Sequence, residues 1–589
     1  MTKLIFLILK FFLNELFSLN SILMNFKNFI QEIDITKFLL YRFNKKKLFF
    51  RDDYLNSFLH MNYDRLNQKN RFSSKKIILV DLTLSHHVEY SLLNCLIAND
   101  LGGQLKKNLC GLINPNDQKT IQIAKSFGIK KFIYYKRKNI FSRFRYFLKA
   151  TNLLNNQSNI KKIISLSYKN IEVGKSSYEQ YIRFHTRSNF KIDFYFYLSL
   201  AKSLEAVDFF ENLYESYEIN HSIIAETQFI PHKIFFQIAL KRKNIVYARF
   251  GSGLENYNVR IYKNFRDSFS HKRKYSKKLV SFLINNFKKK LIKEVNNYFS
   301  KVKPERRIGF EDAFVGNKRI VNIINIKHKN DLNKRFNFNK KNKLNILILP
   351  NVLQDNILNS EWSLFQSPYD WFKKTLIHIK DIVNFNWIIK PHPAEIFYRE
   401  DLKAKEIFNS TINEVENIKF MDEKMHINNL HKHIDLVLTY NGSCGYEYSA
   451  LGVPVVTAAD TRYSDFEFTI APKNIKKYLY TLKNIDKVIN NFTVDRFKAK
   501  LFWYMDNCFF GVMRMSHGLI PRMATQGPQK YVNWNKFWQK LLINFKKKKN
   551  LNTFSKNFSL QQQNYNRHSF NLGCFGIKNI KKIKKLSDT

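Results

Sequence analysis

Short apolar runs that stop at polar loops recur along two stretches of this 589-residue chain. In the first stretch, such runs at 77–82, 132–135, 222–225 and 245–248 alternate with helical periodicity over 88–99, 121–127, 194–217 and 231–240. This alternation is typical of parallel strands joined by crossover helices. The pattern therefore predicts an α/β unit, in which Gly102, Gly103 and Gly128 end two of the helices.

A second α/β unit is predicted by apolar runs at 344–349, 387–389, 436–438 and 454–456. Between the first two runs, Ser367 and Pro368 form a helix-start signal. The predicted helix turns Trp371, Phe372, Leu376, Ile379 and Val383 inward at helical spacing. Residues 262–343 contain helix patterns and no apolar strand, so they are expected to end the first unit and link it to the second.

The loop after the run at 387–389 reads Lys390-Pro391-His392-Pro393. Each proline fixes its own φ angle and holds the preceding residue extended, so His392 is expected to lie beyond the strand end. An imidazole at such a position donates readily to a phosphate oxygen. The alternative is that Pro-His-Pro only ends a strand in a turn.

The loop after the run at 436–438 consists of small and polar residues and precedes a helix predicted over 446–451, which Gly452 ends. A strand, a small-residue loop and a helix start together direct backbone N–H groups at an anion. The glycines allow close approach of the backbone, and the hydroxyls add donors. Glu447, in the first helical turn, either caps the helix or accepts from a ribose hydroxyl. The candidate phosphate-binding residues are Lys390, His392, Thr439, Asn441, Gly442, Ser443, Cys444 and Gly445, with both loops expected at adjacent strand ends.

The motifs WIIKPHPAE and TYNGSCGYEYSALGVPVV resemble the donor domain of GT-B glycosyltransferases that build bacterial surface polysaccharide, including the histidine-proline capsule biosynthesis proteins. A more distant resemblance extends to sialyl- and Kdo-transferases and to UDP-GlcNAc 2-epimerase. The resemblance as a whole covers roughly 344–478. It implies that His392, Ser443 and Thr439 bind a nucleotide phosphate. Many relatives have Gly-Thr or Ser-Ser where this chain has Asn441 to Cys444, so which hydroxyl meets the phosphate stays open.

The predicted fold class is α/β with two Rossmann-like domains, in the GT-B arrangement, and helical N- and C-terminal extensions. The helices at 475–505 are expected to return to the first domain. The division is a basic helical extension at 1–71, an acceptor domain with helical insertions at 72–335, a nucleotide-sugar domain at 340–500, C-terminal helices at 501–548, and a weakly ordered basic tail at 549–589.

Three further residues are candidate site residues because of their positions at strand ends or in loops. Glu226 follows a strand of the first domain, where a transferase needs a base for the acceptor hydroxyl, and a solvated or helix-capping role is the alternative that its position favours. Asp355 lies in the loop after 344–349 and is a candidate to orient the substrates, or a turn residue. Arg462 is a candidate partner of a diphosphate, or a surface arginine.

The net charge of +52 comes from 99 Lys and Arg against 47 Asp and Glu. Because these lysines are spread along the whole chain, nucleic-acid binding is not predicted, and an anionic inner-membrane surface is the expected partner of this charge. The five cysteines lack CxxC spacing, which indicates neither a disulfide framework nor a zinc site and fits a cytoplasmic protein. The aromatic stripe from Trp534 to Phe545 is expected either to pack in a core or to dock on a membrane.

The sequence thus predicts a glycosyltransferase that moves a sugar from a nucleotide-sugar to a saccharide or lipid-linked saccharide. No cofactor is expected and, because the donor domain has no DxD-like motif, no metal. The alternatives are an epimerase or hydrolase of the UDP-GlcNAc 2-epimerase type and a non-catalytic polysaccharide-binding module. The segment Gly174 to Ser177 lacks the preceding glycine of a P-loop, so that interpretation is rejected.

Overall fold

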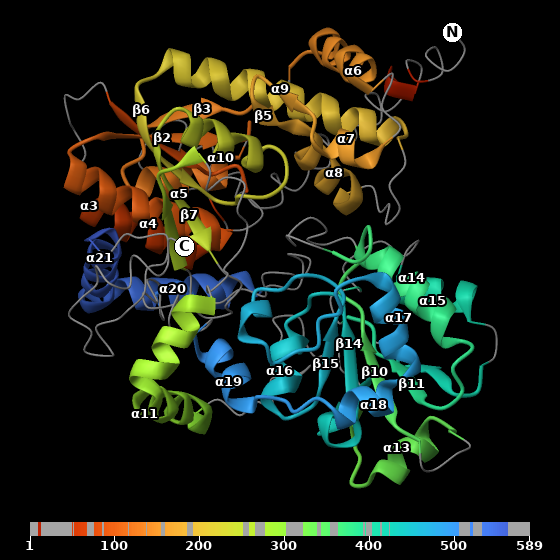
Figure 1. Ribbon diagram of the computed structural model, residues 1–589. Helices are drawn as coiled ribbons and strands as arrows, with labels where there is room; N and C mark the ends of the chain where they lie inside the picture. Colours follow the sequence, from red (N-terminus) through yellow and green to blue (C-terminus); the bar gives the residue numbers. More distant parts are fainter. Residues whose placement is uncertain are drawn as a thin grey trace.

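The structure is a computed structural model that shows two α/β units in one chain (Figure 1). It describes residues 7, 10–12, 50, 52–66, 76–84, 88–115, 117–136, 138–154, 159–184, 192–250, 258–265, 277–301, 322–338, 343–353, 363–392, 395, 403–412, 415–422, 425–505, 519–521 and 533–563. Among the helices of these ranges, none combines the length and the hydropathy needed to cross a bilayer.

The first unit is built on a sheet with the strand order β3-β2-β1-β6-β7-β8. All neighbouring strands are parallel except β8, which runs antiparallel to β7. In chain order the five parallel strands have the 3-2-1-4-5 arrangement of Rossmann-like sheets, and β8 is a sixth strand at the edge. The strands are β1 (Ile77–Asp81), β2 (Asn108–Ile113), β3 (Lys131–Tyr134), β6 (Ile219–Ile224), β7 (Ile245–Phe250) and β8 (Asn258–Tyr262).

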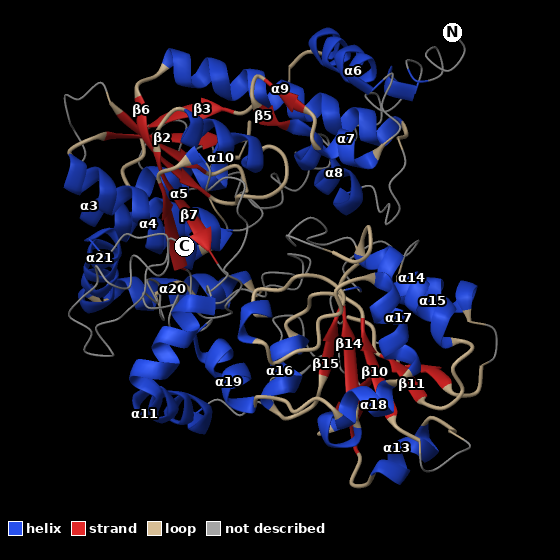
Figure 2. Ribbon diagram, viewed as in Figure 1, coloured by secondary structure: helices blue, strands red, loops and turns tan. Residues whose placement is uncertain are grey.

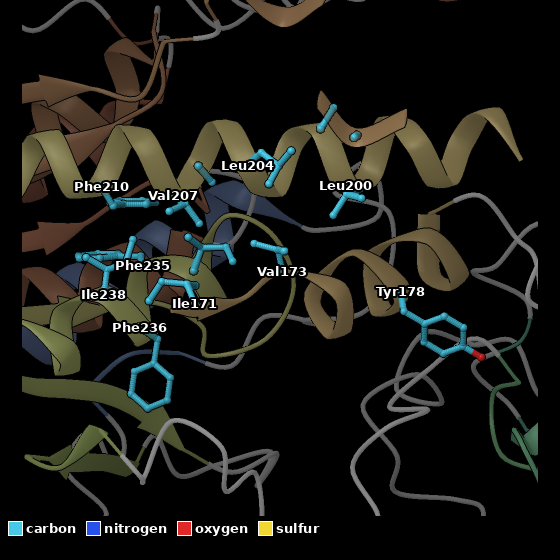
Figure 3. Close-up of a cluster of buried hydrophobic side chains, with 14 of the residues drawn as sticks. Ile171, Val173, Tyr178, Leu200, Leu204, Val207, Phe210, Phe235, Phe236 and Ile238 are labelled. Atoms are coloured by element: carbon cyan, nitrogen blue, oxygen red, sulfur yellow. The ribbon is translucent and has the colours of Figure 1, made fainter. Parts of the chain in front are cut away.

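Helices cover both faces of this sheet, so its central strands are buried on both sides, whereas the edge strand β3 is partly exposed. Along β1, Ile78 and Val80 belong to one apolar cluster, whereas Ile77 and Leu79 belong to the other. The first cluster contains residues of α3 (Asp53–Leu66), α4 (Val88–Leu105) and α5 (Gln118–Ser126). The second contains residues of α6 (Ile140–Leu154), α8 (Val173–Phe184), α9 (Phe194–Ser216) and α10 (His232–Lys241), and part of it is drawn in Figure 3.

The second unit has an all-parallel sheet with the order β12-β11-β10-β14-β15 (Figure 2). This is again the 3-2-1-4-5 arrangement, so the predicted α/β class with two Rossmann-like units is confirmed. The strands are β10 (Asn345–Leu349), β11 (Asn386–Ile389), β12 (Ile418–Phe420), β14 (Leu436–Thr439) and β15 (Val455–Thr457). A separate two-stranded sheet pairs β9 (Asn322–Asn325) with β13 (Met425–Asn428).

The helix predicted after Ser367 is α14 (Pro368–Ile379), and the Ser367 side chain accepts from the Asp370 backbone N–H as its cap. Trp371, Phe372, Leu376 and Ile379 are buried as predicted, but Val383 lies beyond the helix and is 60% exposed. The other helices of this unit are α13 (Lys329–Arg335), α15 (Ala404–Thr411), α16 (Cys444–Ala450), α17 (Ile475–Lys483), α18 (Ile485–Asn490) and α19 (Arg496–Tyr504), and α11 (Lys277–Lys301) packs on α19.

The return to the first unit is made by α20 (Trp534–Lys546) and α21 (Lys548–Gln563), not by the helices at 475–505. Helices α17 and α19 instead pack on α14 and α16 of the second unit. In α20, Trp538 and Phe545 are buried against Phe58 of α3, with ring centroids 6.0 and 5.0 Å away. The aromatic stripe is therefore core, which excludes the membrane-docking alternative for it, and a helix occupies 548–563 where a weakly ordered tail was expected.

Three further elements differ from the sequence-based expectation. Helix α4 continues through Gly102 and Gly103 to Leu105. A Cβ atom on Gly102 would lie 3.0 Å from Leu109 Cδ2, so this glycine provides close packing of the helix on β2 and is not a stop. Strand β2 itself was not predicted, and strand β9 lies in the region that was expected to contain none.

The segment Gly174 to Ser177 lies within helix α8, which agrees with the rejection of a P-loop. A Cβ atom on Gly174 would lie 1.9 Å from the carbonyl oxygen of Ile163. The glycine is therefore required for the contact between α8 and α7 (Ile160–Ile164), and its role is packing.

Replacing the buried Trp538 with alanine is expected to lower the free energy of unfolding by about 3 to 5 kcal/mol, because the substitution opens a cavity between α20 and α3. Ile543→Ala is the matched control, since Ile543 lies on the same helix and is 49% exposed. Urea denaturation followed by circular dichroism measures both variants. Equal, small losses would show that α20 is not part of the core of the first unit.

Candidate functional site

The strand order of the second sheet reverses between β10 and β14. From β10 the chain proceeds to β11 and β12 on one side, and then to β14 and β15 on the other. The loops that leave the carboxyl ends of β10 and β14 therefore diverge, and such a switch point is where open α/β sheets bind ligands. The polar loops found in the sequence lie at this edge of the sheet.

Strand β10 lies between β11 and β14, so the expectation that the two predicted loops sit at adjacent strand ends was wrong. Strand β10 and the loop that follows it connect the two predicted loops. On one side, Lys390 at the end of β11 donates its backbone N–H to Ile348 O of β10 over 3.0 Å. On the other side, Asn351 Nδ2 donates to Asn441 Oδ1 over 2.6 Å.

Asn351 was not predicted as a site residue, although it holds the loop after β14 in place. Its Oδ1 accepts from the Thr439 hydroxyl at 3.4 Å, and Thr439 Oγ1 in turn accepts from Gly442 N–H at 3.3 Å. The signal available in the sequence was its position, since it is the first polar side chain after Leu349 and Pro350. The side chains of Asn351, Thr439 and Asn441 form one hydrogen-bonded group at the switch point.

Both glycines of the loop after β14 are required by close packing. A Cβ atom on Gly445 would lie 1.9 Å from Tyr463 Oη, and one on Gly442 would lie 3.0 Å from Thr439 Oγ1. The buried Tyr463 phenol fills the space beside Gly445 and donates to Gly442 O over 2.6 Å. The loop conformation is therefore fixed from below by Tyr463 and from the side by Thr439 and Asn351.

Helix α16 begins at Cys444, directly after the exposed Ser443. Ser443 makes no side-chain capping bond to the helix, while its carbonyl accepts from Tyr446 N–H and Glu447 N–H at 3.1 and 3.2 Å. Its hydroxyl is therefore not used by the capping of the helix. Burial raises the pKa of the neighbouring Cys444 thiol to about 12 against the opposing Thr439 hydrogen bond, so this thiol is protonated at neutral pH.

The charge of Glu447 acts on Lys390 in this site. Burial lowers the pKa of Lys390 to about 8, and the nearby Glu447 and Cys444 oppose that shift. Lys390 comes from the end of β11 and Glu447 from the first turn of α16, so the interaction connects the two predicted loops across β10. A lysine held at this pKa is an adjustable positive charge near neutral pH.

His392 is half-buried, and its carbonyl accepts from Glu395 N–H at 2.9 Å. That its imidazole faces the Ser443 turn stays a prediction. Arg462 follows β15 and is half-buried. Burial raises the pKa of Tyr463, the residue that holds the glycine loop, and the charge of Arg462 opposes that increase. Asp355 lies outside the described residues.

Glu226, the predicted base, lies in the first unit just after β6. Its Oε1 accepts from the backbone N–H groups of Thr227 and Gln228 at 2.8 and 3.3 Å. The carboxylate therefore caps its own turn, which is the alternative that the sequence left open. Across the described ranges, no three His, Cys, Asp or Glu side chains gather closely enough to hold a metal ion.

The first unit approaches this site through helix α8. Tyr178 of α8 points away from the other labelled side chains of its cluster (Figure 3). Burial raises the pKa of Tyr178, and Tyr440, which follows β14, adds to the increase. The two phenols therefore lie within electrostatic range of each other, one from each unit.

No protein-family model and no curated protein matches the chain. Solved structures match over much of its length. They include UDP-GlcNAc 2-epimerase from Neisseria meningitidis bound to UDP-GlcNAc, at 12% identity over 73% of this chain and 99% of that one, with a TM-score of 0.23. The beta Kdo 2,4 transferase KpsC from Thermosulfurimonas dismutans is similar at 11% identity over 49% and 79%, with a TM-score of 0.27. MurG from Acinetobacter baumannii is similar at 10% identity over 73% and 95%, with a TM-score of 0.22.

Gly445→Ala is expected to lower the melting temperature of the second unit by several degrees, because the added methyl group displaces Tyr463 from Gly442. Gly103→Ala is the control, since a Cβ atom there meets nothing within 4 Å and alanine favours a helix. Differential scanning calorimetry compares the two. A tolerated Gly445→Ala would show that Tyr463 does not fix the loop.

Proposed function

We propose that this chain is a glycosyltransferase whose second unit binds the phosphate groups of a nucleotide-sugar at the switch point between β10 and β14. The observation that carries the proposal is the glycine loop at the switch point, which Asn351 holds through Asn441 and Tyr463 holds through Gly442, with Lys390 at the end of β11. A half-buried cation near close-approach glycines is suited to an oxyanion.

In this site, the phosphate oxygens accept from the Lys390 ammonium, the His392 imidazole and the Ser443 hydroxyl, while Thr439 donates to Asn351 and holds the loop. Cys444 contributes its backbone N–H group, Gly442 and Gly445 allow close approach of the backbone, and Asn441 fixes the loop through Asn351. Glu447 accepts from a ribose hydroxyl, and Arg462 pairs with the outer phosphate. These fixed charges and dipoles stabilise the phosphate that leaves when the glycosidic bond breaks, so the transfer is proposed to be metal-independent.

The first unit is proposed to bind the acceptor, a saccharide or lipid-linked saccharide. The proposed domain limits of 72–335 and 340–500 are revised at their junction, because β9 pairs with β13 and Leu332 packs in the core of the second unit. Helices α20 and α21 are added to the first domain, because they complete its core. Two alternative functions predict different experimental outcomes. An epimerase or hydrolase turns over UDP-GlcNAc without an acceptor, and a binding module shows no nucleotide-dependent stabilisation. Location in the cytoplasm at an anionic membrane surface stays a prediction from composition.

Screening UDP-N-acetylglucosamine, GDP-mannose, CMP-sialic acid and CDP-glycerol by thermal shift is expected to identify one donor class that raises the melting temperature. For that donor, Lys390→Met is expected to weaken binding about 10- to 100-fold, the loss of one hydrogen bond to a charged group. Lys380→Met is the control, because Lys380 is an exposed lysine at the end of α14. Stabilisation by no donor in the wild type would contradict the proposed function.

Binding of that donor is also expected to weaken as the pH rises above about 8, the value to which burial lowers the pKa of Lys390. Below that pH the free protein already carries the charge. Above it, Lys390 is neutral and must take up a proton before it pairs with phosphate. Lys390→Arg is expected to remove this pH dependence, because arginine stays charged. Calorimetric titration at pH 7, 8 and 9 compares the two proteins, and parallel profiles would exclude Lys390 from the phosphate site.

A further inference from the structure

A buried polar cluster occupies the switch point of the first sheet, between β1 and β6. Asp81 is the last residue of β1 and is 1% exposed. Thr83 follows it by two residues, and His232 opens helix α10 after β6. By the same rule that located the site of the second unit, this is the edge at which the first unit is expected to bind a ligand.

The carboxylate of Asp81 is held by four hydrogen-bond or ionic contacts. Oδ1 accepts from Thr83 N–H at 3.0 Å and from the Thr83 hydroxyl at 2.7 Å, and Oδ2 accepts from Ala225 N–H at 3.2 Å. His232 Nε2 lies 3.6 Å from Oδ2 and 2.9 Å from Thr83 Oγ1. Within the described chain, no lysine or arginine contacts this carboxylate, so a positive charge that forms on His232 lies beside an unbalanced negative one.

These contacts fix the tautomer of the His232 ring. The Thr83 hydroxyl has one hydrogen, and that hydrogen is donated to Asp81 Oδ1. Thr83 Oγ1 therefore accepts from His232, which places the ring proton on Nε2. The lone pair is left on Nδ1, which makes no hydrogen bond to a described residue, and 7% of the side chain stays exposed.

We infer that His232 Nδ1 is the proton acceptor for the hydroxyl group that attacks the donor sugar, and that Asp81 and Thr83 orient the ring. In this step the hydroxyl oxygen forms a bond to the anomeric carbon, the bond from that carbon to the phosphate oxygen breaks, and the phosphate leaves with the electron pair. The hydroxyl proton moves to Nδ1, and the imidazolium is stabilised by the Asp81 carboxylate.

Two observations favour His232 over Glu226 in this role. Glu226 Oε1 already accepts two backbone N–H groups of its own turn. In addition, His232 opens helix α10 directly after the loop of β6, at the carboxyl edge of the sheet where a ligand of the first unit is expected. The inference rests on the proposed transferase function.

The test uses the full chain and the donor identified by thermal shift, with release of nucleotide as the measure of turnover. His232→Gln is expected to lower turnover about 100- to 10,000-fold while the donor dissociation constant changes little. His60→Gln is the control, because His60 is exposed on α3 of the same unit. Asp81→Asn tests the positioning role through the ring ¹⁵N shifts of His232, which are expected to show the Nε2–H tautomer in the wild type and its loss in the variant.

The outcomes separate this inference from the function on which it rests. If the wild type neither binds nor turns over any donor, the proposed function fails and the inference fails with it. If the wild type turns over donor and His232→Gln does so within tenfold, only the inference fails. An Nδ1–H tautomer in the folded wild type, or a large loss in Glu226→Gln with none in His232→Gln, also overturns it.

Discussion

Burial of both faces of two parallel sheets is the constraint on which the rest of this structure depends. Strands β1 and β10 lie at the centre of their sheets, and their apolar residues contribute alternately to clusters on opposite faces. Such strands have little room for polar side chains, so polar chemistry is confined to the loops at their carboxyl ends. This holds in both units, with Asp81 ending β1 and Asn351 following β10.

Elements that depend on local signals could be predicted from the sequence. The apolar runs of β10, β11 and β14, the Ser367 cap of α14 and the left-handed Gly452 after α16 are examples. Elements that depend on packing between distant segments could not. Gly102 lies within a helix because Leu109 of the next strand packs against it, and Gly111 lies within β2 beneath Phe132 of β3. Neither contact is visible in a local pattern of residue types.

The same distinction applies to the candidate sites. Motifs close in sequence located the loops around His392 and Ser443, but the insertion of β10 between them is a property of strand order. Asn351 contacts Asn441 across 90 positions, and Thr83 contacts His232 across 149. Without an alignment of relatives, such pairs are recognisable only after the chain is folded. Spacing therefore indicated where a ligand is expected to bind and left open which side chains surround that position.

The core of the first unit is discontinuous in the chain, because α20 and α21 follow the whole of the second unit and yet bury their aromatic residues against α3 and β7. During synthesis, the second unit leaves the ribosome before the first has its last two helices. Until then the apolar face of α3 and α5 has no cover, which makes the nascent first unit the more exposed to aggregation and to chaperones. Completion of the first unit is thus coupled in time to synthesis of the second.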